Sequence, residues 1–152
     1  MKLNTVMDKS TLLKAIKNRL EEKIQKFEKL IEETRASNND TKSSMGDKYE
    51  TGREMLQQEI NNLQRQLNEA LNQQTLLQKI SAETSTKVQN GALVETDKGL
   101  FYIAASVGEI IFDNQKVMTV SGESPLAKAM AGLIKGQGFS LNNITQSIKH
   151  IW

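Results

Sequence analysis

The sequence predicts an α+β protein in which a long antiparallel helical hairpin precedes a small antiparallel β domain with one helix. Apolar residues recur every three or four positions through the first half of the chain, which is the period of a helix. One polar segment interrupts this pattern. After Thr86 the helical period disappears, and glycine and β-branched residues become frequent. We therefore expect two domains, 1–86 and 87–152.

The first apolar stripe begins at Leu13 and continues through Ile16, Leu20, Ile24, Phe27 and Ile31. These steps of three and four place the side chains on one face of a helix. Opposite charges four residues apart, such as Lys17 and Glu21, add a small stabilisation on the solvated face. The stripe stops at Arg35, and the polar segment 36–46 predicts the bend of the hairpin.

A second apolar stripe follows the bend, and it has no proline. It comprises Leu56, Ile60, Leu63, Leu67, Leu71, Leu77 and Ile80. Two facing helices of roughly 25 to 33 residues would be about 40 to 50 Å long. A coiled-coil hairpin of that length projects beyond the width of a small domain.

The second half predicts strands and one helix in the order ββββαββ. Turn residues separate apolar runs at 92–95 and 100–104, at 109–112 and 116–120, and at 139–141 and 144–151. Ser124 is a good helix N-cap, Pro125 suits the first turn, and Gly136 and Gly138 are expected to end the helix.

Composition excludes several kinds of site. The chain has no cysteine, so disulfides, thiolate metal sites and cysteine nucleophiles are absent. Its 20 basic and 18 acidic residues give a net charge of +2, which disfavours autonomous DNA binding. No apolar run approaches the length of a membrane span. We expect a cytoplasmic protein that makes no membrane contact and whose partner is another protein.

Two short motifs within this architecture resemble the Gre-type transcript cleavage factors, which join a coiled-coil hairpin to a small FKBP-like domain. The segment SPLAKA, residues 124–129, with the glycines at 132 and 136, is similar to a family segment in the C-terminal domain. The sequence GDKYE, residues 46–50, is similar to the motif at the family's hairpin tip. The next residues, TGRE at 51–54, depart from the family's usual continuation.

The resemblance implies a transcription elongation factor that binds RNA polymerase at its secondary channel. Glu123, Ser124 and Pro125 would contact the rim of that channel. Asp47 and Glu50 would be the catalytic acids and metal ligands at the tip, holding a Mg²⁺ ion shared with the polymerase, with Asp40 as a possible third acid. The chain would meet the 3′ end of the nascent RNA only indirectly. It would stimulate the polymerase's own RNA cleavage and would not be a free-standing enzyme.

The residues leave other interpretations open. Ser44 and Asp47 also resemble a capping box, in which the tip acids only stabilise a helix start. The altered residues after the tip favour a regulator that occupies the secondary channel without stimulating cleavage. An FKBP-like prolyl isomerase and a coiled-coil adaptor are two further classes, although the few aromatic residues disfavour a proline pocket.

Overall fold

The computed structural model describes residues 8–42 and 50–152, with side chains described outside 38–51. Two compact units are present, and each is described by itself. The hairpin unit is Arg19–Thr75, and the β unit combines residues 8–18 with Leu76–Trp152. The predicted division into domains 1–86 and 87–152 stays a prediction.

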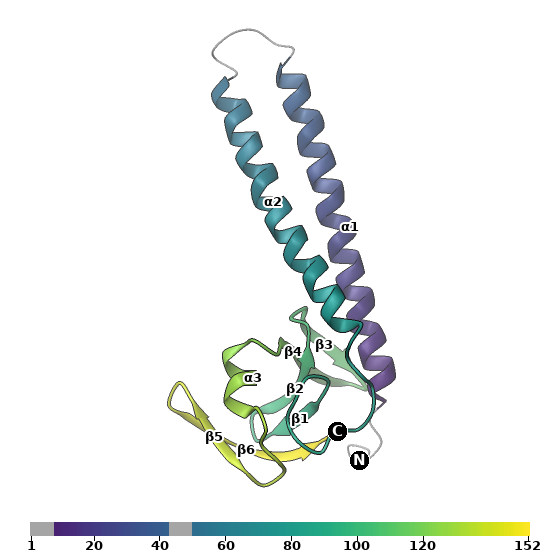
Figure 1. Cartoon of the computed structure of the whole chain (residues 1–152), viewed down its shortest axis with the longest axis vertical. Helices are drawn as coiled ribbons and strands as arrows, with labels where there is room; N and C mark the ends of the chain where they lie inside the picture. Colours follow the sequence, from purple (N-terminus) through teal and green to yellow (C-terminus); the bar gives the residue numbers. More distant parts are fainter. Residues whose placement is uncertain (1–7, 43–49) are drawn as a thin grey trace. The chain divides into compact units, whose positions relative to one another are not determined.

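The greater part of two long helices forms the hairpin unit. Helix α1, Lys9–Lys42, has 34 residues, and α2, Glu50–Leu77, has 28. Within this unit they run side by side in opposite directions (Figure 1). A hydrogen bond of 2.8 Å from the Gln74 side chain to the Glu21 carboxylate joins them. The apolar side chains buried in this unit are Leu20, Ile24, Ile31, Ile60, Leu63, Leu67 and Ala70. The predicted antiparallel helical hairpin is therefore confirmed.

The bend lies later in the chain than the sequence analysis predicted. We expected the segment 36–46 to be a turn, whereas α1 continues to Lys42. Residues 36–42 contain neither glycine nor proline. Each of these polar residues raises the free energy of a helix by only a few tenths of a kcal/mol relative to Ala. Extending an existing helix also costs much less free energy than starting a new one. Polarity alone therefore did not end α1.

The β unit contains, in the described part of the chain, a six-stranded sheet in the order β3-β4-β2-β1-β6-β5. Its strands are β1 (Leu93–Thr96), β2 (Gly99–Ala104), β3 (Gly108–Phe112), β4 (Gln115–Ser121), β5 (Gly138–Leu141) and β6 (Ile144–Ile151). Helix α3, Pro125–Met130, lies between β4 and β5 in the sequence. The predicted order ββββαββ and the α+β fold class are confirmed.

One strand pair differs from the expected antiparallel sheet. Strands β2 and β4 are parallel, with Leu100 opposite Val117, while the other four pairs are antiparallel. A two-residue turn at Asp113 and Asn114 joins β3 to β4, and both residues have positive φ. This tight turn folds β3 and β4 into a hairpin. Strand β3 runs opposite to β2, and β4 runs opposite to β3. Because β4 lies beside β2 while β3 is at the edge, the neighbouring strands β2 and β4 point the same way.

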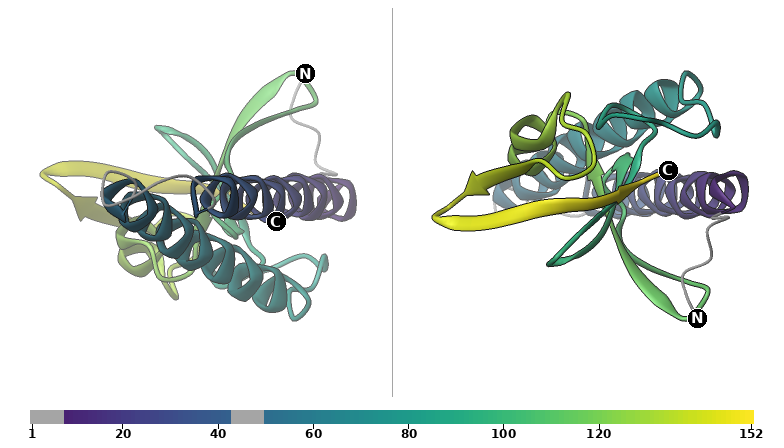
Figure 2. Two further views of the ribbon diagram at one scale, coloured as in Figure 1. Left: turned by 90° about the horizontal axis from the view of Figure 1, so that it is seen from above. Right: turned by 90° about the horizontal axis from the view of Figure 1, so that it is seen from below.

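Helix α3 packs on the sheet next to β4 and β5 (Figures 1 and 2). Ala127 and Met130 of α3 are buried. They belong to an apolar core that also contains Val88, Ala92, Val94, Ile103, Ile148 and Ile151. Burial of such side chains is the main force that holds a small domain together.

Helix α3 ends earlier than the glycines at 136 and 138 had suggested. Ala131 leaves the helical conformation with ψ of 129°, and Gly132 has a φ of +80°. The backbone N–H of Gly132 donates to the carbonyl of Val88, and the N–H of Val88 donates to the carbonyl of Leu133, both at 2.9 Å. These paired hydrogen bonds draw the chain away from α3, a long-range effect that the local sequence does not reveal.

Lys9 fixes the start of α1 inside the β unit. Its side chain is 3% exposed, and its Nζ donates to the main-chain oxygens of Glu83 at 2.6 Å and Trp152 at 3.0 Å. Burial lowers the pKa of Lys9 from 10.5 to about 8, because the charged form loses hydration.

No helix in the described ranges is long and apolar enough to cross a bilayer.

The lowered pKa of Lys9 predicts a pH-dependent stability. Between pH 8 and 10.5 the unfolded chain binds more protons than the folded one, so the stability of the wild type should rise with pH; below pH 8 the burial cost is fully present. Denaturant titrations at pH 7.5 and pH 10 measure this effect. Between these two pH values, the free energy of unfolding of the wild type should rise by on the order of 2 kcal/mol relative to that of Lys9→Met. Lys14→Met, which removes an exposed lysine, is the control. If the wild type rose in stability by the same amount relative to both variants, the pH dependence would not come from Lys9.

Candidate functional site

The loop before α3 presents the three residues predicted to contact a partner. Glu123 and Pro125 are exposed, and Ser124 is half-buried between them. The Ser124 hydroxyl donates to the carbonyl of Ser121 at 2.8 Å and accepts from the backbone N–H of Ala127 at 3.1 Å. It is therefore the N-cap of α3, as predicted, and its two bonds fix the loop to both β4 and α3.

Glu123 keeps its carboxylate in solvent. Its nearest described cation is Lys128, with 3.6 Å between Oε1 and Nζ, and the two side chains are 87% and 65% exposed. An exposed ion pair of this kind contributes little to stability, because water and salt screen it. The carboxylate can therefore exchange Lys128 for a basic group on another molecule at small cost.

Two residues that were not predicted from the sequence, Asn90 and Gly122, support this loop. A hollow of about 50 Å³ beneath it is lined by Asn90, Gly122 and Ala127, among others. A Cβ atom added at Gly122 would collide with the Asn90 side chain, so glycine lets the loop lie close to residue 90. This requirement depends on a segment 32 positions away in the chain, and only the structure shows it.

The predicted tip acids cannot be assembled into a site from the described residues. Asp47 lies outside them, while Asp40 in α1 and Glu50 at the start of α2 lie among the positions whose side chains are not described. Among the residues that the structure does describe, no three acidic or histidine side chains are grouped to hold a metal. The metal and catalytic roles of Asp47 and Glu50 stay predictions.

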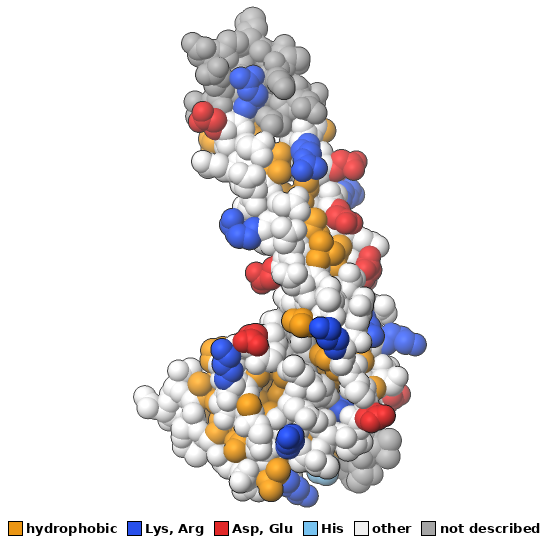
Figure 3. All heavy atoms as spheres, viewed as in Figure 1, with side chains coloured by type: hydrophobic (Ala, Val, Ile, Leu, Met, Phe, Trp, Pro, Cys, Tyr) orange, Lys and Arg blue, Asp and Glu red, His pale blue; other side chains and the backbone are white. Residues whose placement is uncertain are grey.

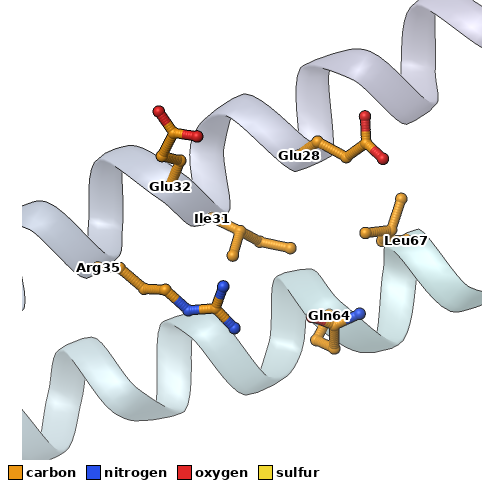
Figure 4. Close-up of a pocket in the computed structure, with 6 residues that line it drawn as sticks. All are labelled: Glu28, Ile31, Glu32, Arg35, Gln64 and Leu67. Atoms are coloured by element: carbon orange, nitrogen blue, oxygen red, sulfur yellow. The ribbon is translucent and has the colours of Figure 1, made fainter.

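A second hollow, of about 430 Å³, opens between the helices of the hairpin unit (Figure 4). Its lining residues from α1 are Glu28, Ile31, Glu32 and Arg35, and those from α2 are Gln64 and Leu67. Ile31 and Arg35 point from α1 towards α2, whereas Glu32 points away. Hydrophobic side chains are visible between the two helices in the space-filling view (Figure 3). From the sequence we expected this part of both helices to be an ordinary apolar seam, and the hollow was not predicted.

Comparison with solved structures returns proteins of similar length. The crystal structure of GreA factor homolog 1 (Gfh1) of Thermus thermophilus has 17% identity and a TM-score of 0.38, covering 90% of this chain and 94% of that one. Another, described as the structure of the transcription factor Gfh1, has 14% identity and a TM-score of 0.38, covering 88% and 89%. Gfh1 of Thermus aquaticus has 16% identity and a TM-score of 0.36, covering 88% and 92%. No protein-family model and no curated protein matches the chain.

The N-cap bonds of Ser124 predict a measurable stability cost. Ser124→Ala removes the acceptor for the Ala127 N–H and should lower the free energy of unfolding by about 1 kcal/mol. Ser147→Ala, which removes an exposed hydroxyl from β6, should change it by less than about 0.5 kcal/mol. Urea titrations of the two variants check this difference, and equal midpoints would show that the cap is not stabilising.

Proposed function

We propose that this chain is a Gre-type transcription elongation factor that binds RNA polymerase at its secondary channel and presents tip carboxylates to the polymerase's active centre. The observation that carries the proposal is the loop at 123–125, where the family-like segment SPLAKA begins a helix held firmly on the sheet. Glu123 and Pro125 are exposed at that helix start. The loop is thus accessible and ordered, as a docking element requires.

The β unit would supply most of the binding specificity. The bonds of Ser124 hold Glu123 and Pro125 in a fixed geometry, so little conformational entropy is lost when a partner binds. The exposed Glu123 carboxylate fits a basic group on the polymerase rim. Pro125 adds a rigid apolar contact beside that charge.

The hairpin unit would supply the length needed to extend into the channel. At 1.5 Å per residue, the 28 residues of α2 extend about 42 Å. Because α1 and α2 pair along one seam, the two helices can enter an opening only a little wider than a helix pair.

Asp47 and Glu50 would serve as oxygen ligands at the end of that hairpin. Carboxylates are the protein ligands that Mg²⁺ commonly takes together with phosphate and water. A bound Mg²⁺ ion would stabilise negative charge at the scissile phosphate and favour an attacking water. The chain's own residues would only hold and position the ion, while the polymerase provides the remaining machinery and the RNA.

Binding tests the docking loop. The double variant Glu123→Ala and Pro125→Ala should weaken binding to RNA polymerase about tenfold, which corresponds to ~1.4 kcal/mol. Fluorescence titration of labelled protein with core polymerase measures the affinity. Glu109→Ala, which removes an exposed acid from β3, is the matched control and should bind as the wild type does. Equal affinity of the double variant and the control would refute the docking role.

Cleavage of backtracked RNA tests the tip acids. Asp47→Asn and Glu50→Gln should keep polymerase affinity but lower stimulated cleavage by about tenfold or more, because amides lack the charge that binds Mg²⁺. Glu54→Gln changes an exposed acid of α2 and should leave cleavage unchanged. If all three variants cleave equally well, the acids act only as helix caps.

A second candidate is a regulator that occupies the secondary channel without stimulating cleavage. The observation that favours it is the TGRE sequence after the tip motif, whose Gly52 lies within α2. A glycine there weakens the first turns of the helix that carries Glu50. Wild-type protein that binds polymerase but never shortens backtracked RNA, at any magnesium concentration, would select this function.

A further inference from the structure

A tight turn before β1 fixes the position of Asn90. The backbone N–H of Ala92 donates to the carbonyl of Gln89 at 3.0 Å, and Gly91 has a φ of +92°. These features define a β-turn with Asn90 and Gly91 at its two central positions, the second of which requires positive φ. Glycine also fits the space there, because a Cβ atom would lie only 3.1 Å from the carbonyl oxygen of Ser81.

Buried neighbours hold this turn from both sides. On one side, Val88 exchanges two hydrogen bonds with the chain that leaves α3. On the other side, the N–H of Gly91 donates to the carbonyl of Ile103 at 2.7 Å, and the N–H of Ile103 donates to the carbonyl of Ala92 at 3.0 Å. Val88 and Ile103 are each 2% exposed, whereas Asn90 is exposed. The main chain at Asn90 is therefore held in place although its side chain meets solvent.

The Asn90 carboxamide lies against the docking loop. A Cβ atom added at Gly122 would collide with Oδ1 of Asn90 and would lie 3.5 Å from its Nδ2. Gly122 immediately precedes Glu123 in the sequence. In the described part of the chain, no residue hydrogen-bonds to the Asn90 side chain, so its two N–H donors are available to another molecule. The turn thus brings an exposed amide beside the exposed carboxylate of the loop.

These two groups are chemically different and together define what they would recognise. The Glu123 carboxylate attracts a basic group, but attraction between exposed charges imposes little direction. A hydrogen bond from the Asn90 amide weakens steeply when it is misaligned, so it would add direction to that attraction. The matching surface is a basic side chain next to a neutral acceptor such as a main-chain carbonyl. Because the main chain at Asn90 is already fixed, the contact would cost little conformational entropy.

We propose that Asn90 is a further polymerase-binding residue, which donates a hydrogen bond to a neutral acceptor on the channel rim, beside the basic group that Glu123 contacts. This inference rests on the proposed function and deepens it, since it adds a directional contact to a charged one. Gly122 has a positioning role in it, because any larger residue there would push the Asn90 carboxamide aside.

Fluorescence titration of the full chain with core RNA polymerase tests this contact. Asn90→Ala should weaken binding about fivefold, as expected for the loss of one neutral hydrogen bond. This ratio should be the same at low and high salt, because neither partner in the bond is charged. The loss caused by Glu123→Ala should instead shrink as salt is raised. If the loss for Asn90→Ala shrank in parallel, Asn90 would act only by positioning Glu123, and the direct contact would be overturned.

Gly122→Ala gives an independent test of the same contact. The φ of Gly122 lies outside the left-handed region, so alanine meets no backbone strain there, but its Cβ must displace the Asn90 carboxamide. This variant should also bind about fivefold more weakly. The double variant Asn90→Ala with Gly122→Ala should bind no more weakly than either single variant, because both changes remove one contact. Losses that multiply in the double variant would overturn the proposal.

The same turn offers a matched control in Gln89→Ala. This change removes another exposed carboxamide, whose Nε2 lies 3.5 Å from Oγ of Ser85, and it should leave the affinity unchanged. A loss equal to that of Asn90→Ala would assign the effect to the turn as a whole and refute the contact. If the wild type and Asn90→Ala bound equally well, this inference alone would fail. A wild type without affinity for polymerase would overturn the proposed function and this contact with it.

Discussion

One apolar seam between α1 and α2 is the constraint on which the hairpin unit depends. Helices rich in Asn, Gln and charged residues are only marginally stable alone in water, so tertiary packing must hold them. In the hairpin unit that packing is a thin row of side chains that includes Ile24, Ile31, Ile60 and Leu67. The hollow between the two helices takes its position from this row, since Ile31 and Leu67 also line it.

The β unit meets a different requirement, because its loop at 123–125 is exposed and is nevertheless held by hydrogen bonds. Its core includes Ala127 and Met130 of α3, which fix the helix on the sheet. The hydrogen bonds between Val88 and the Gly132–Leu133 segment hold the chain where it leaves α3. Ser124 then connects α3 to the end of β4. Buried contacts thus orient exposed residues that contribute little to stability themselves.

Strong local signals made most of the secondary structure predictable. The strand pairs around Asp113 and Asn114 were found because these residues suit positive φ, and Ser124 with Pro125 marked the start of α3. The features that were not predicted depend on contacts between residues far apart in the sequence. Backbone pairing with Val88 ended α3 early, and the parallel pairing of β2 with β4 depended on how a hairpin packs. The hollow between the two helices depends on the register in which they pair, which the apolar stripes do not specify.

The central claim, that the hairpin enters the polymerase while the β unit stays at its rim, can be tested by site-directed cross-linking. The chain has no cysteine, so Met55→Cys in α2 and Ile134→Cys in the β unit each give one attachment site, at positions 65% and 51% exposed. We expect a short cross-linker at residue 55 to label polymerase segments around the catalytic magnesium, and one at residue 134 to label the channel entrance. Labelling of the same outer surface from both positions would contradict the account.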